Sequence, residues 1–583
     1  MNLRMSGWLW SLGLIALVGV LACQPSEKAG KNSLATPSAK AQTGWFKEVA
    51  TDSGLAFFHE NGAAGNYYLP EIMGSGSAVF DFDGDGDLDV FLIQSGPFPP
   101  HQTPEKARDR LFRNDSNLQA SPKLRFTDVT EESGIRADGY GMGACVADYD
   151  RDGWPDLYVT NYGNNQLWRN LGNGTFEDVT IQANANDPRW SVSASFCDFN
   201  RDGWPDLVVT NYVVFSKELH RPCMGSTLDY CHPRSYEPEA ALLLANKGDG
   251  RFEDVSVSSG IATLRGRALG VVIADLNGDN LEDIYVANDA MDNFLWTNQG
   301  DGSFKETGLF AGVALNLTGQ PEGSMGVDVA DFDNDGDEDV FISHLRKETN
   351  TLYRNGGKGF FEDVSNPSGL GQPSLPFTGF GTGWADFDQD GLLDLFVANG
   401  SVAKLEDLIQ NQDPLPYHQR NQVFRQTQPG TFVEVTQSLA GAIADHSEVS
   451  RGTSFCDIDN DGDIDLLVSN NNGPVRLYVN HVPSQAWIGF VLPNQAGLPY
   501  LDQTKITLTF SDGSRVHHRF HTDGSYLSTN DPRLLIGLGK KPPIQEILVA
   551  WPGGFTSKVL DFQAGRYHTL SFPSELTQTE VDP

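Results

Sequence analysis

The sequence predicts an all-β protein in which a seven-bladed β-propeller is followed by a small β-sandwich-like domain. Three observations predict this fold: an acidic nine-residue loop that occurs seven times, a short aromatic strand motif that accompanies these loops, and a composition with 61 glycines and only 7 methionines. Many glycines suit tight turns between short strands better than they suit long helices. A unit that recurs along a chain indicates a repeat architecture.

The acidic loop has the pattern D-x-[DN]-x-D-[GN]-x-x-D. Carboxylates at alternate positions repel one another unless a cation lies among them, and oxygen ligands in this arrangement are what Ca²⁺ prefers. The glycine at the sixth position permits the sharp turn that makes the ligands converge. The sequence therefore predicts up to seven structural calcium sites, with these ligands: Asp81, Asp83, Asp85 and Asp89; Asp148, Asp150, Asp152 and Asp156; Asp198, Asn200, Asp202 and Asp206; Asp275, Asn277, Asp279 and Asp283; Asp331, Asp333, Asp335 and Asp339; Asp386, Asp388, Asp390 and Asp394; and Asp457, Asp459, Asp461 and Asp465.

These loops differ from EF-hand loops. None has glutamate at the twelfth position, and each is followed by a β-branched segment such as LYVTN, which indicates a strand rather than a helix. A solvated Asp/Gly-rich turn without metal is the alternative for any single loop. It applies above all to the loop that starts at Asp198, which has asparagine at position three, and to the one that starts at Asp275, where Asn280 replaces glycine.

A longer unit recurs around each acidic loop. A Gly-rich apolar strand such as GMGACVAD precedes the loop, and a β-branched strand, a strand of the form L-[YW]-x-N, a glycine turn and an F-x-[DE]-V-[TS] strand follow it. The unit thus has four short strands, and four-stranded antiparallel units that repeat every ~50–60 residues form propeller blades. In these motifs the unit resembles the FG-GAP/VCBS repeats of the integrin-α type.

The F-x-[DE]-V-[TS] motif also predicts how the ring closes. The motif or a close variant of it follows each of the first six acidic loops but not the seventh, and a spare copy, Phe46-Lys47-Glu48-Val49, precedes the first loop. We therefore expect residues 45–50 to form the outermost strand of the last blade, which leaves no unpaired edge between the first and last blades. The predicted propeller spans residues 45–482.

Three insertions lengthen the repeats, at about residues 95–109, 212–241 and 400–421, each between the second and third strands of its blade. Because strands alternate in direction, these insertions lie on the face opposite the acidic loops. We expect this face to bind the ligand, since function often resides in loops on a rigid scaffold; ordinary long surface loops are the alternative. The candidate residues in these insertions are His220, Arg221, Tyr230, His232, Tyr236, Tyr417, His418 and Arg420.

The N-terminus predicts export. Residues 1–22 have a positive start and an apolar run of about fifteen residues, as in a signal peptide. Val20-Leu21-Ala22-Cys23 resembles a bacterial lipobox, which implies lipidation of Cys23 and a flexible linker over residues 23–44; an ordinary secretory signal is the alternative. Because Gln24 is not aspartate, we expect an exported outer-membrane or cell-surface lipoprotein of a bacterium.

An exported protein reaches an oxidising environment, in which its other cysteines can form disulfides. Cys223 and Cys231 lie within one insertion, where a disulfide between them is expected. Cys145, Cys197 and Cys456 each end an apolar strand and are expected to be small buried core residues.

Residues 483–573 alternate like strands and precede a tail at 574–583. The segments Asp523–Ser528 (DGSYLS), Leu535–Gly539 (LIGLG) and Val549–Gly554 (VAWPGG) together resemble the ASPIC/UnbV domain. A propeller followed by this module resembles the cartilage acidic protein family and its bacterial relatives, although Leu492–Thr504 departs from the stretch usual at the start of the module. His517, His518 and His521 are not expected to bind metal, because the first two face opposite sides of a strand.

Charge and motifs limit the function. The net charge of −36, from 41 basic and 77 acidic residues, argues against a nucleic-acid partner. The resemblance implies an extracytoplasmic, calcium-stabilised binding or adhesion protein for a protein or carbohydrate ligand at the cell surface, attached to the membrane by its lipid anchor alone. No catalytic residue is assigned, because the sequence has no G-x-S-x-G, H-E-x-x-H or comparable motif. The alternative is a polysaccharide lyase or hydrolase with its site in the propeller funnel.

Overall fold

The computed structural model describes residues 44–98, 108–117, 123–221, 223–224, 227–483 and 485–573. The predicted signal peptide, Cys23, the linker up to residue 43 and the tail at 574–583 lie outside the described residues. The chain from Gly44 onward forms one compact unit. Within the described ranges, no helix combines the length and the apolar character needed to cross a membrane.

Strands form seven four-stranded antiparallel sheets within residues 46–480 of the described chain. In chain order they contain β2 (Ser77–Phe80), β3 (Asp89–Leu92), β4 (Arg110–Asn114) and β5 (Phe126–Asp128); β6 (Gly141–Ala147), β7 (Asp156–Asn161), β8 (Gln166–Asn170) and β9 (Phe176–Asp178); β10 (Ser191–Cys197), β11 (Asp206–Asn211), β14 (Leu242–Asn246) and β15 (Phe252–Asp254); β16 (Ala268–Ala274), β17 (Asp283–Asn288), β18 (Phe294–Asn298) and β19 (Phe304–Glu306); β20 (Val327–Ala330), β21 (Asp339–Ile342), β22 (Thr351–Asn355) and β23 (Phe361–Asp363); β24 (Gly379–Ala385), β25 (Asp394–Asn399), β27 (Gln422–Gln428) and β28 (Thr431–Glu434); and β30 (Ser450–Cys456), β31 (Asp465–Asn470), β32 (Arg476–Asn480) and β1 (Phe46–Glu48).

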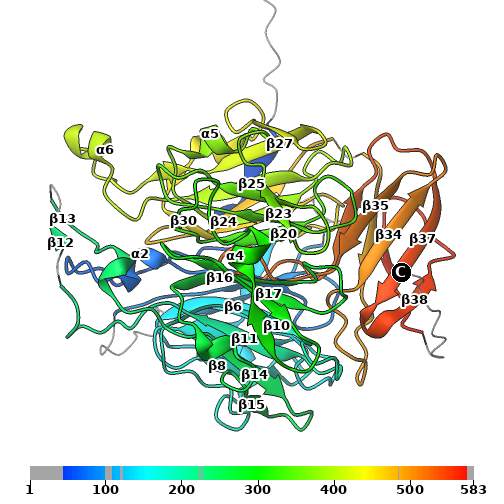
Figure 1. Cartoon of the computed structure of the whole chain (residues 1–583), viewed down its shortest axis with the longest axis horizontal. Helices are drawn as coiled ribbons and strands as arrows, with labels where there is room; N and C mark the ends of the chain where they lie inside the picture. Colours follow the sequence, from blue (N-terminus) through cyan, green and yellow to red (C-terminus); the bar gives the residue numbers. More distant parts are fainter. Residues whose placement is uncertain are drawn as a thin grey trace, which may run out of the picture. The chain divides into compact units, whose positions relative to one another are not determined.

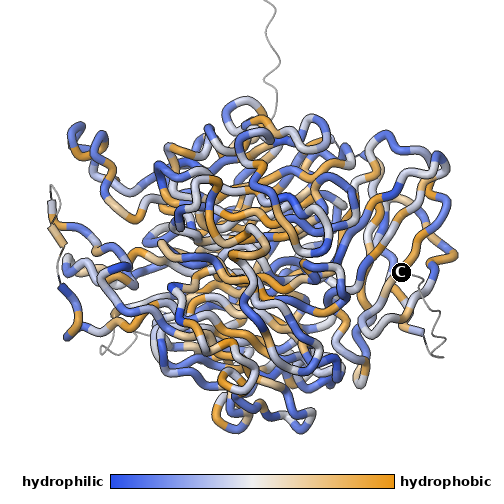
Figure 2. The backbone as a smooth tube through the Cα atoms, viewed as in Figure 1, coloured by the Kyte–Doolittle hydropathy of each residue, from blue (hydrophilic) through white to orange (hydrophobic). Residues whose placement is uncertain are grey.

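The first strands of these sheets form a closed ring. β2, β6, β10, β16, β20, β24 and β30 contact one another in this order, and β30 contacts β2. β1 pairs antiparallel with β32, with Phe46 opposite Asn480, so the N-terminal segment completes the last sheet as expected. The predicted all-β propeller class is confirmed, and each sheet is hereafter called a blade. Figure 2 shows hydrophobic stretches along the strands and hydrophilic stretches at many of the loops.

Short helical turns and minor strands join the blades. After an outermost strand, the turns α1, α3 and α4 each end at a left-handed glycine, for example Gly54 with a φ of 102°. The bounds of the connecting elements are α1 (Ala50–Ser53), α2 (Pro70–Met73), α3 (Thr130–Ser133), β12 (Cys223–Met224), β13 (Leu228–Asp229), η1 (Pro233–Ser235), η2 (Ile261–Thr263), α4 (Gly308–Ala311), α5 (Gly371–Ser374), α6 (Glu406–Gln410), β26 (Gln419–Arg420), α7 (Ala442–Asp445) and β29 (Ser447–Glu448).

The insertions gather on one face of the ring. The elements α2, β12, β13 and α6 lie on the side away from β34, β35, β37 and β38 (Figure 1). Rings from different insertions meet there: Phe98 lies 6.2 Å from Phe215, and Tyr230 lies 5.9 Å from Tyr417. Cys223 and Cys231 form a disulfide in this region. We call this side of the ring the insertion face.

The C-terminal region is a sandwich of two sheets with its own apolar core, to which Ile488, Phe490, Ile506 and Val549 belong. It lies on the acidic-loop face of the propeller: Arg151 donates to the Leu498 carbonyl at 2.6 Å, and the Tyr567 hydroxyl donates to Asp457 at 2.8 Å. Its elements are β33 (Trp487–Val491), β34 (Lys505–Phe510), β35 (Arg515–Arg519), β36 (Leu534–Gly537), β37 (Ile544–Trp551), η3 (Pro552–Gly554), β38 (Phe555–Lys558) and β39 (Tyr567–Thr569), in the strand orders β36-β33-β39 and β35-β34-β37-β38.

A segment of this domain, residues 523–530, enters the centre of the ring, and we call it the axial segment. It contacts the first strand of every blade. The contacts are Thr529 N to Ser77 O (2.9 Å), Ala144 N to Leu527 O (3.1 Å), Ser195 Oγ to Asp523 (3.0 Å), Ile273 N to Asp523 (2.7 Å), Val327 N to Ser525 O (3.0 Å), the Tyr526 ring to the Phe380 ring (4.9 Å) and Phe455 N to Asn530 Oδ1 (3.1 Å).

Candidate metal sites

The first aspartate of each acidic loop organises the turn. Asp81 accepts hydrogen bonds from the backbone N–H groups of Asp85 and Gly86, at 3.2 and 3.0 Å. The equivalent pair of bonds recurs in the other six loops. The sixth residue is left-handed, with a φ of 93° at Gly86 and 62° at Asn280. Because asparagine tolerates this conformation better than most residues, Asn280 can replace glycine there.

The ninth aspartate of each loop is buried at the start of the second strand. In the first blade, Asp89 accepts N–H bonds from Phe82 at 3.0 Å and from Asn114 at 2.8 Å. The bond from the third strand recurs in all seven loops, from Asn114, Asn170, Asn246, Asn298, Asn355, Gln426 and Asn480. The backbone therefore fixes the position of this carboxylate before any cation binds.

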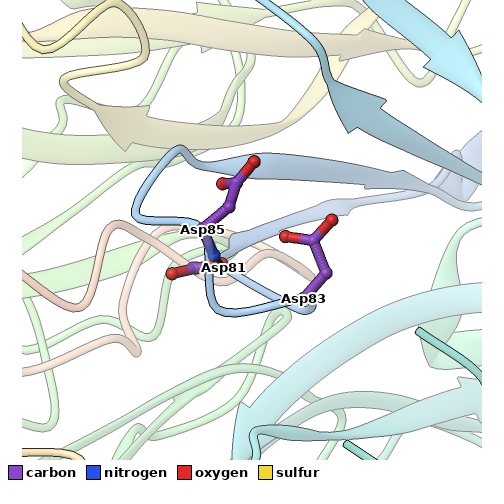
Figure 3. Close-up of side chains that lie close together, drawn as sticks. All are labelled: Asp81, Asp83 and Asp85. Atoms are coloured by element: carbon purple, nitrogen blue, oxygen red, sulfur yellow. Dashed lines mark hydrogen bonds between the residues drawn. The ribbon is translucent and has the colours of Figure 1, made fainter. Parts of the chain in front are cut away.

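Carboxylates converge in five of the seven loops. In each, three aspartates place an oxygen within 4.8 Å of one another: Asp81, Asp83 and Asp85; Asp148, Asp150 and Asp156; Asp331, Asp333 and Asp339; Asp386, Asp388 and Asp394; and Asp457, Asp459 and Asp465. Figure 3 shows the first group on one turn between β2 and β3. Among the described residues, no such trio of acids forms in the loops of Asp198 and Asp275, where Asn200 and Asn277 hold the third position.

Several carboxylate oxygens in these turns are buried and lack a hydrogen-bond partner, which indicates whether a cation would fit there. The Oδ1 atoms of Asp83, Asp333, Asp388 and Asp459, all at the third position, are buried and accept no hydrogen bond. A buried acceptor without a partner is costly, and a cation in the turn removes that cost. All the converging atoms are carboxylate oxygens, the donor set of a hard cation such as Ca²⁺. The residues present therefore fit the ion that the sequence predicts.

The same turns are electrostatically strained when no cation is bound. Burial, together with the charges of neighbouring aspartates, raises the pKa of Asp89 and of Asp386 to about 8 and that of Asp339 to about 9. Burial likewise raises the pKa of Asp331 to about 7. At neutral pH several of these groups therefore either hold a proton or require a positive charge.

The third-strand asparagine, replaced by Gln426 in the sixth blade, connects each acidic loop to the next blade. Its side-chain amide donates to the carbonyl at position two of the preceding loop, for example from Asn170 to Phe82 at 2.8 Å and from Asn480 to Phe387 at 2.9 Å. The first blade completes the ring, because Asn114 donates to Ile458 of the last loop at 3.3 Å. A change in one loop therefore acts on the neighbouring blade.

We expect the calcium-free protein to melt at a higher temperature as the pH falls from about 8 to about 6. The folded pKa of Asp386 is about 8 and that of Asp331 about 7, above the value of about 3.9 for an unfolded aspartate. The folded chain thus binds more protons than the unfolded chain. The stability that these protons contribute is complete below the unfolded pKa and is lost as the pH rises through the folded pKa. Scanning calorimetry of calcium-depleted protein tests this. A melting temperature that falls over the same interval would contradict it, and saturating calcium should flatten the trend, because metal and protons compete.

The insertion face brings together residues from three segments. The Tyr67 and Tyr230 rings are 5.2 Å apart, and Tyr417 packs against Tyr230. Lys404 Nζ donates to the Tyr67 hydroxyl at 3.0 Å, and the Tyr417 hydroxyl donates to Asp229 at 2.7 Å. We call Tyr67, Tyr230 and Tyr417 the tyrosine cluster.

The other candidates of the insertions have separate environments. Tyr236 is buried in the apolar core at the centre of the ring, His220 packs at 4.9 Å on Tyr68, and Arg420 pairs with Glu434. His418 Nδ1 lies 2.7 Å from the Ser447 carbonyl. The sequence did not single out Tyr67 or Lys404, because neither belongs to a motif. Exposed apolar side chains on this face are Phe58 (53% exposed), Leu219 (51%), Met224 (76%) and Leu415 (49%).

The centre of the ring is filled by side chains. Tyr526 and Leu527 of the axial segment are 0% and 1% exposed. Arg451 is fully buried beside them, with its guanidinium 3.9 Å from the centre of the Phe380 ring, and it donates to the Ile72 carbonyl. Burial lowers the pKa of Arg451 to about 9. The chain itself thus fills the centre of the propeller, where the alternative enzyme function would place its site.

The cysteines outside the disulfide and the histidines of the C-terminal domain lie in separate environments. Cys145, Cys197 and Cys456 are buried and carry free thiols, as expected for core residues. His521 Nδ1 lies 3.3 Å from Asp523, and the groups of three or more converging ligand atoms among the described residues contain none of the three C-terminal histidines.

Comparison with protein families supports the class of protein that these features define. Residues 81–159, 148–209, 275–342 and 331–397 match the FG-GAP-like repeat, and residues 502–577 match ASPIC and UnbV. The chain is an FG-GAP-repeat protein with a C-terminal ASPIC/UnbV domain.

Among individual proteins, it is similar to cartilage acidic protein 1. It is 25% identical to the human protein over 508 residues, which cover 83% of this chain and 70% of that protein. It is 32% identical to the Xenopus tropicalis protein over 169 residues, which cover 27% of this chain and 25% of that one.

Three solved structures show low overall similarity to this chain. A lectin from Agrocybe aegerita that recognises terminal N-acetylglucosamine has a TM-score of 0.36 at 15% identity, covering 69% of this chain and 94% of that one. A rhamnogalacturonan lyase, YesW, has a TM-score of 0.36 at 16% identity, covering 71% and 73%. YCF48 bound to a D1 peptide has a TM-score of 0.40 at 7% identity, covering 74% and 96%.

Proposed function

We propose that the protein is an extracytoplasmic, calcium-stabilised binding protein that presents its insertion face to a protein or glycan ligand. The observation that carries this proposal is the opposite placement of two features. The C-terminal domain lies on the acidic-loop face, whereas the tyrosine cluster and the exposed Phe58, Leu219, Met224 and Leu415 lie on the insertion face. Aromatic side chains held by polar contacts on a rigid scaffold are frequent in binding surfaces.

The metal sites have a supporting role in this proposal. Calcium in the acidic loops neutralises converging carboxylates and holds the blades together, and the millimolar calcium outside cells saturates even sites with dissociation constants near 10⁻⁴ M. A disulfide between Cys223 and Cys231 is compatible with an oxidising compartment. The lipobox-like sequence at Cys23 is the basis for placing the protein on a bacterial membrane through a lipid anchor.

The polysaccharide lyase or hydrolase considered as the alternative is not favoured by any observed geometry. Tyr526, Leu527 and Arg451 occupy the centre of the ring and are almost fully buried, so the chain itself fills the part of the funnel in which that site was expected.

The proposal is tested with protein and glycan arrays probed in millimolar calcium. We expect a ligand identified there to bind a Tyr230→Ala/Tyr417→Ala variant at least about tenfold more weakly, because central aromatic residues contribute most to interface energy. The matched control is Phe310→Ala/Phe360→Ala, which removes another pair of aromatic side chains, 79% and 52% exposed, outside the insertion face. Equal loss in both variants, or no loss in the tyrosine variant, would refute the proposed binding face.

A further inference from the structure

One blade of the propeller places a cation of its own against its acidic loop. In the sixth blade, Arg425 on β27 reaches the loop that begins at Asp386: its Nη2 lies 2.6 Å from Asp388 Oδ2 and donates to Asp390 Oδ2 at 2.9 Å. We propose that Arg425 is an internal counter-ion that competes with calcium, so that the sixth loop binds the metal more weakly than the second and fifth loops do. The inference rests on the calcium sites of the proposed function and deepens it.

Arg425 pairs with a ligand oxygen that has no basic partner in the other acidic loops. In all seven loops, Oδ1 of the fifth-position aspartate accepts a hydrogen bond from the N–H group at position seven, as Asp390 does from Leu392 at 3.1 Å. Oδ2 of this aspartate is then the oxygen that remains for a cation. In the described part of the chain, Asp390 is the only fifth-position aspartate that forms an ion pair. The guanidinium therefore occupies a ligand oxygen of the sixth loop.

The residue opposite the arginine on the fourth strand explains why this contact forms in the sixth blade. An arginine also holds this place on the third strand in the second and fifth blades, but there a glutamate lies directly opposite it on the fourth strand. These pairs are Arg169 with Glu177 at 2.9 Å and Arg354 with Glu362 at 2.6 Å. In the sixth blade, Val433 lies opposite Arg425. Because Val433 offers no acceptor, the guanidinium turns to the acidic loop instead.

The arginines of the first and second blades pair with acids outside the metal ligands. Arg169 Nη1 lies 4.0 Å from Asp150, the third-position ligand of its loop, which is beyond hydrogen-bonding distance. Arg113 of the first blade lies opposite Thr127, and its Nε donates to Asp115 at 2.8 Å. An arginine near an acidic loop thus interferes with the ligands only where it has no other acid to pair with.

A metal that enters the sixth loop has to break the contacts of Arg425. The side chains of Arg425 and Asp388 are 34% and 10% exposed, so water screens this pair less than it screens an ion pair on the open surface. Hydrogen bonds between ionised groups are roughly twice as strong as neutral ones. The loop nevertheless still fits a metal, because its carboxylates converge and Asp388 Oδ1 lacks a partner. Arg425 therefore lowers the affinity of the loop without abolishing it.

Variants of the purified full chain that move or remove the arginine test this inference. Native mass spectrometry counts the bound calcium ions at a series of free calcium concentrations set by a chelator. Val433→Glu reproduces the pair of the second and fifth blades at a residue that is 50% exposed, and Arg425→Gln removes the charge. We expect each variant to load one ion at about tenfold lower free calcium than the wild-type chain, because that ion no longer displaces a charged hydrogen-bond donor.

Three control variants assign the change to the sixth loop. Glu362→Val reproduces the sixth-blade pair in the fifth blade, so one ion should then need about tenfold more free calcium. Arg354→Gln controls for the general loss of a positive charge; because this arginine pairs with an exposed glutamate, loading should change by less than about twofold. The gain in Val433→Glu should disappear in Val433→Glu/Asp394→Asn, because Asp394 is a ligand of the sixth loop.

The melting temperature gives a second measurement that a purely structural role of Arg425 would not reproduce. Arg425→Gln should lower the melting temperature of the calcium-free protein, because Asp388 and Asp390 lose their counter-charge. The same variant should show a larger rise in melting temperature when calcium is added. A side chain that only packed against the blade would lower the melting temperature equally with and without calcium.

The inference is overturned if calcium loading is unchanged in Val433→Glu or in Arg425→Gln, or if the gain persists when Asp394 is replaced. Equal melting losses with and without calcium would also overturn it. A wild-type chain that binds no calcium would refute the proposed role of the metal as a whole. A chain that loads calcium but does not respond to these substitutions would refute the role of Arg425 alone, so the two failures are distinguishable.

Discussion

Removing calcium should lower the melting temperature of the protein by about 10 °C. Five loops bring three carboxylates together, and a site saturated at about one hundred times its dissociation constant stabilises the folded state by about 2.7 kcal/mol. Five such sites contribute on the order of 13 kcal/mol, and unfolding a chain of this size involves an entropy of about 1 kcal/mol per degree. The measurement is scanning calorimetry of the same preparation in calcium and after dialysis against a chelator.

Two controls accompany this experiment: one varies the ionic strength, and the other removes a single predicted metal ligand. Sodium chloride at matched ionic strength should not restore the melting temperature, because exposed charges are screened but the buried ligand oxygens are not. An Asp156→Asn variant should bind one calcium ion fewer by native mass spectrometry, since Asp156 belongs to a converging group. A melting temperature that changes by less than about 2 °C on chelation would contradict this prediction. It would mean that the acidic loops keep their conformation without metal and that calcium does not stabilise the fold.

Most of the fold could be predicted because it is encoded locally and repeatedly. Each acidic loop carries its own turn chemistry, and the asparagine of each L-[YW]-x-N strand makes the same bonds in nearly every blade, for example Asn170 to Asp156 and to Phe82. The N-terminal strand at Phe46 could be placed because a motif was missing from the seventh repeat and present before the first. The opposite faces for metal loops and insertions follow from the alternation of strand direction alone.

The candidate sites were predicted less completely, for a physical reason. The metal ligands are neighbours in sequence, whereas the tyrosine cluster joins Tyr67, Tyr230 and Tyr417 from three distant segments. The segment around Tyr526 was recognised as part of a motif, but its entry into the ring could not be deduced, because long-range docking depends on shape rather than on local pattern.

Replacing Tyr526 with alanine should lower the free energy of unfolding by about 3–5 kcal/mol, as for other large aromatic residues removed from a core. The ring of Tyr526 is 0% exposed and packs at 4.9 Å against Phe380, at the point where the axial segment meets all seven blades. The cavity left by the substitution lies in the centre of the ring, where rigid strands on every side limit collapse. Denaturant unfolding followed by circular dichroism measures the change, and limited proteolysis should release the C-terminal domain sooner.

Tyr526→Phe is the matched control, because it keeps the ring and removes only the hydroxyl, whose bond to the Met73 carbonyl is long at 3.4 Å. We expect it to cost less than about 1 kcal/mol. If the alanine and phenylalanine variants were equally stable, packing of the Tyr526 ring would not contribute to the stability of the fold. If only the alanine variant also loses its calcium response, the axial segment is what makes the propeller and the C-terminal domain unfold together. The acidic loops that the C-terminal domain covers would then depend on this one buried ring as well as on their cations.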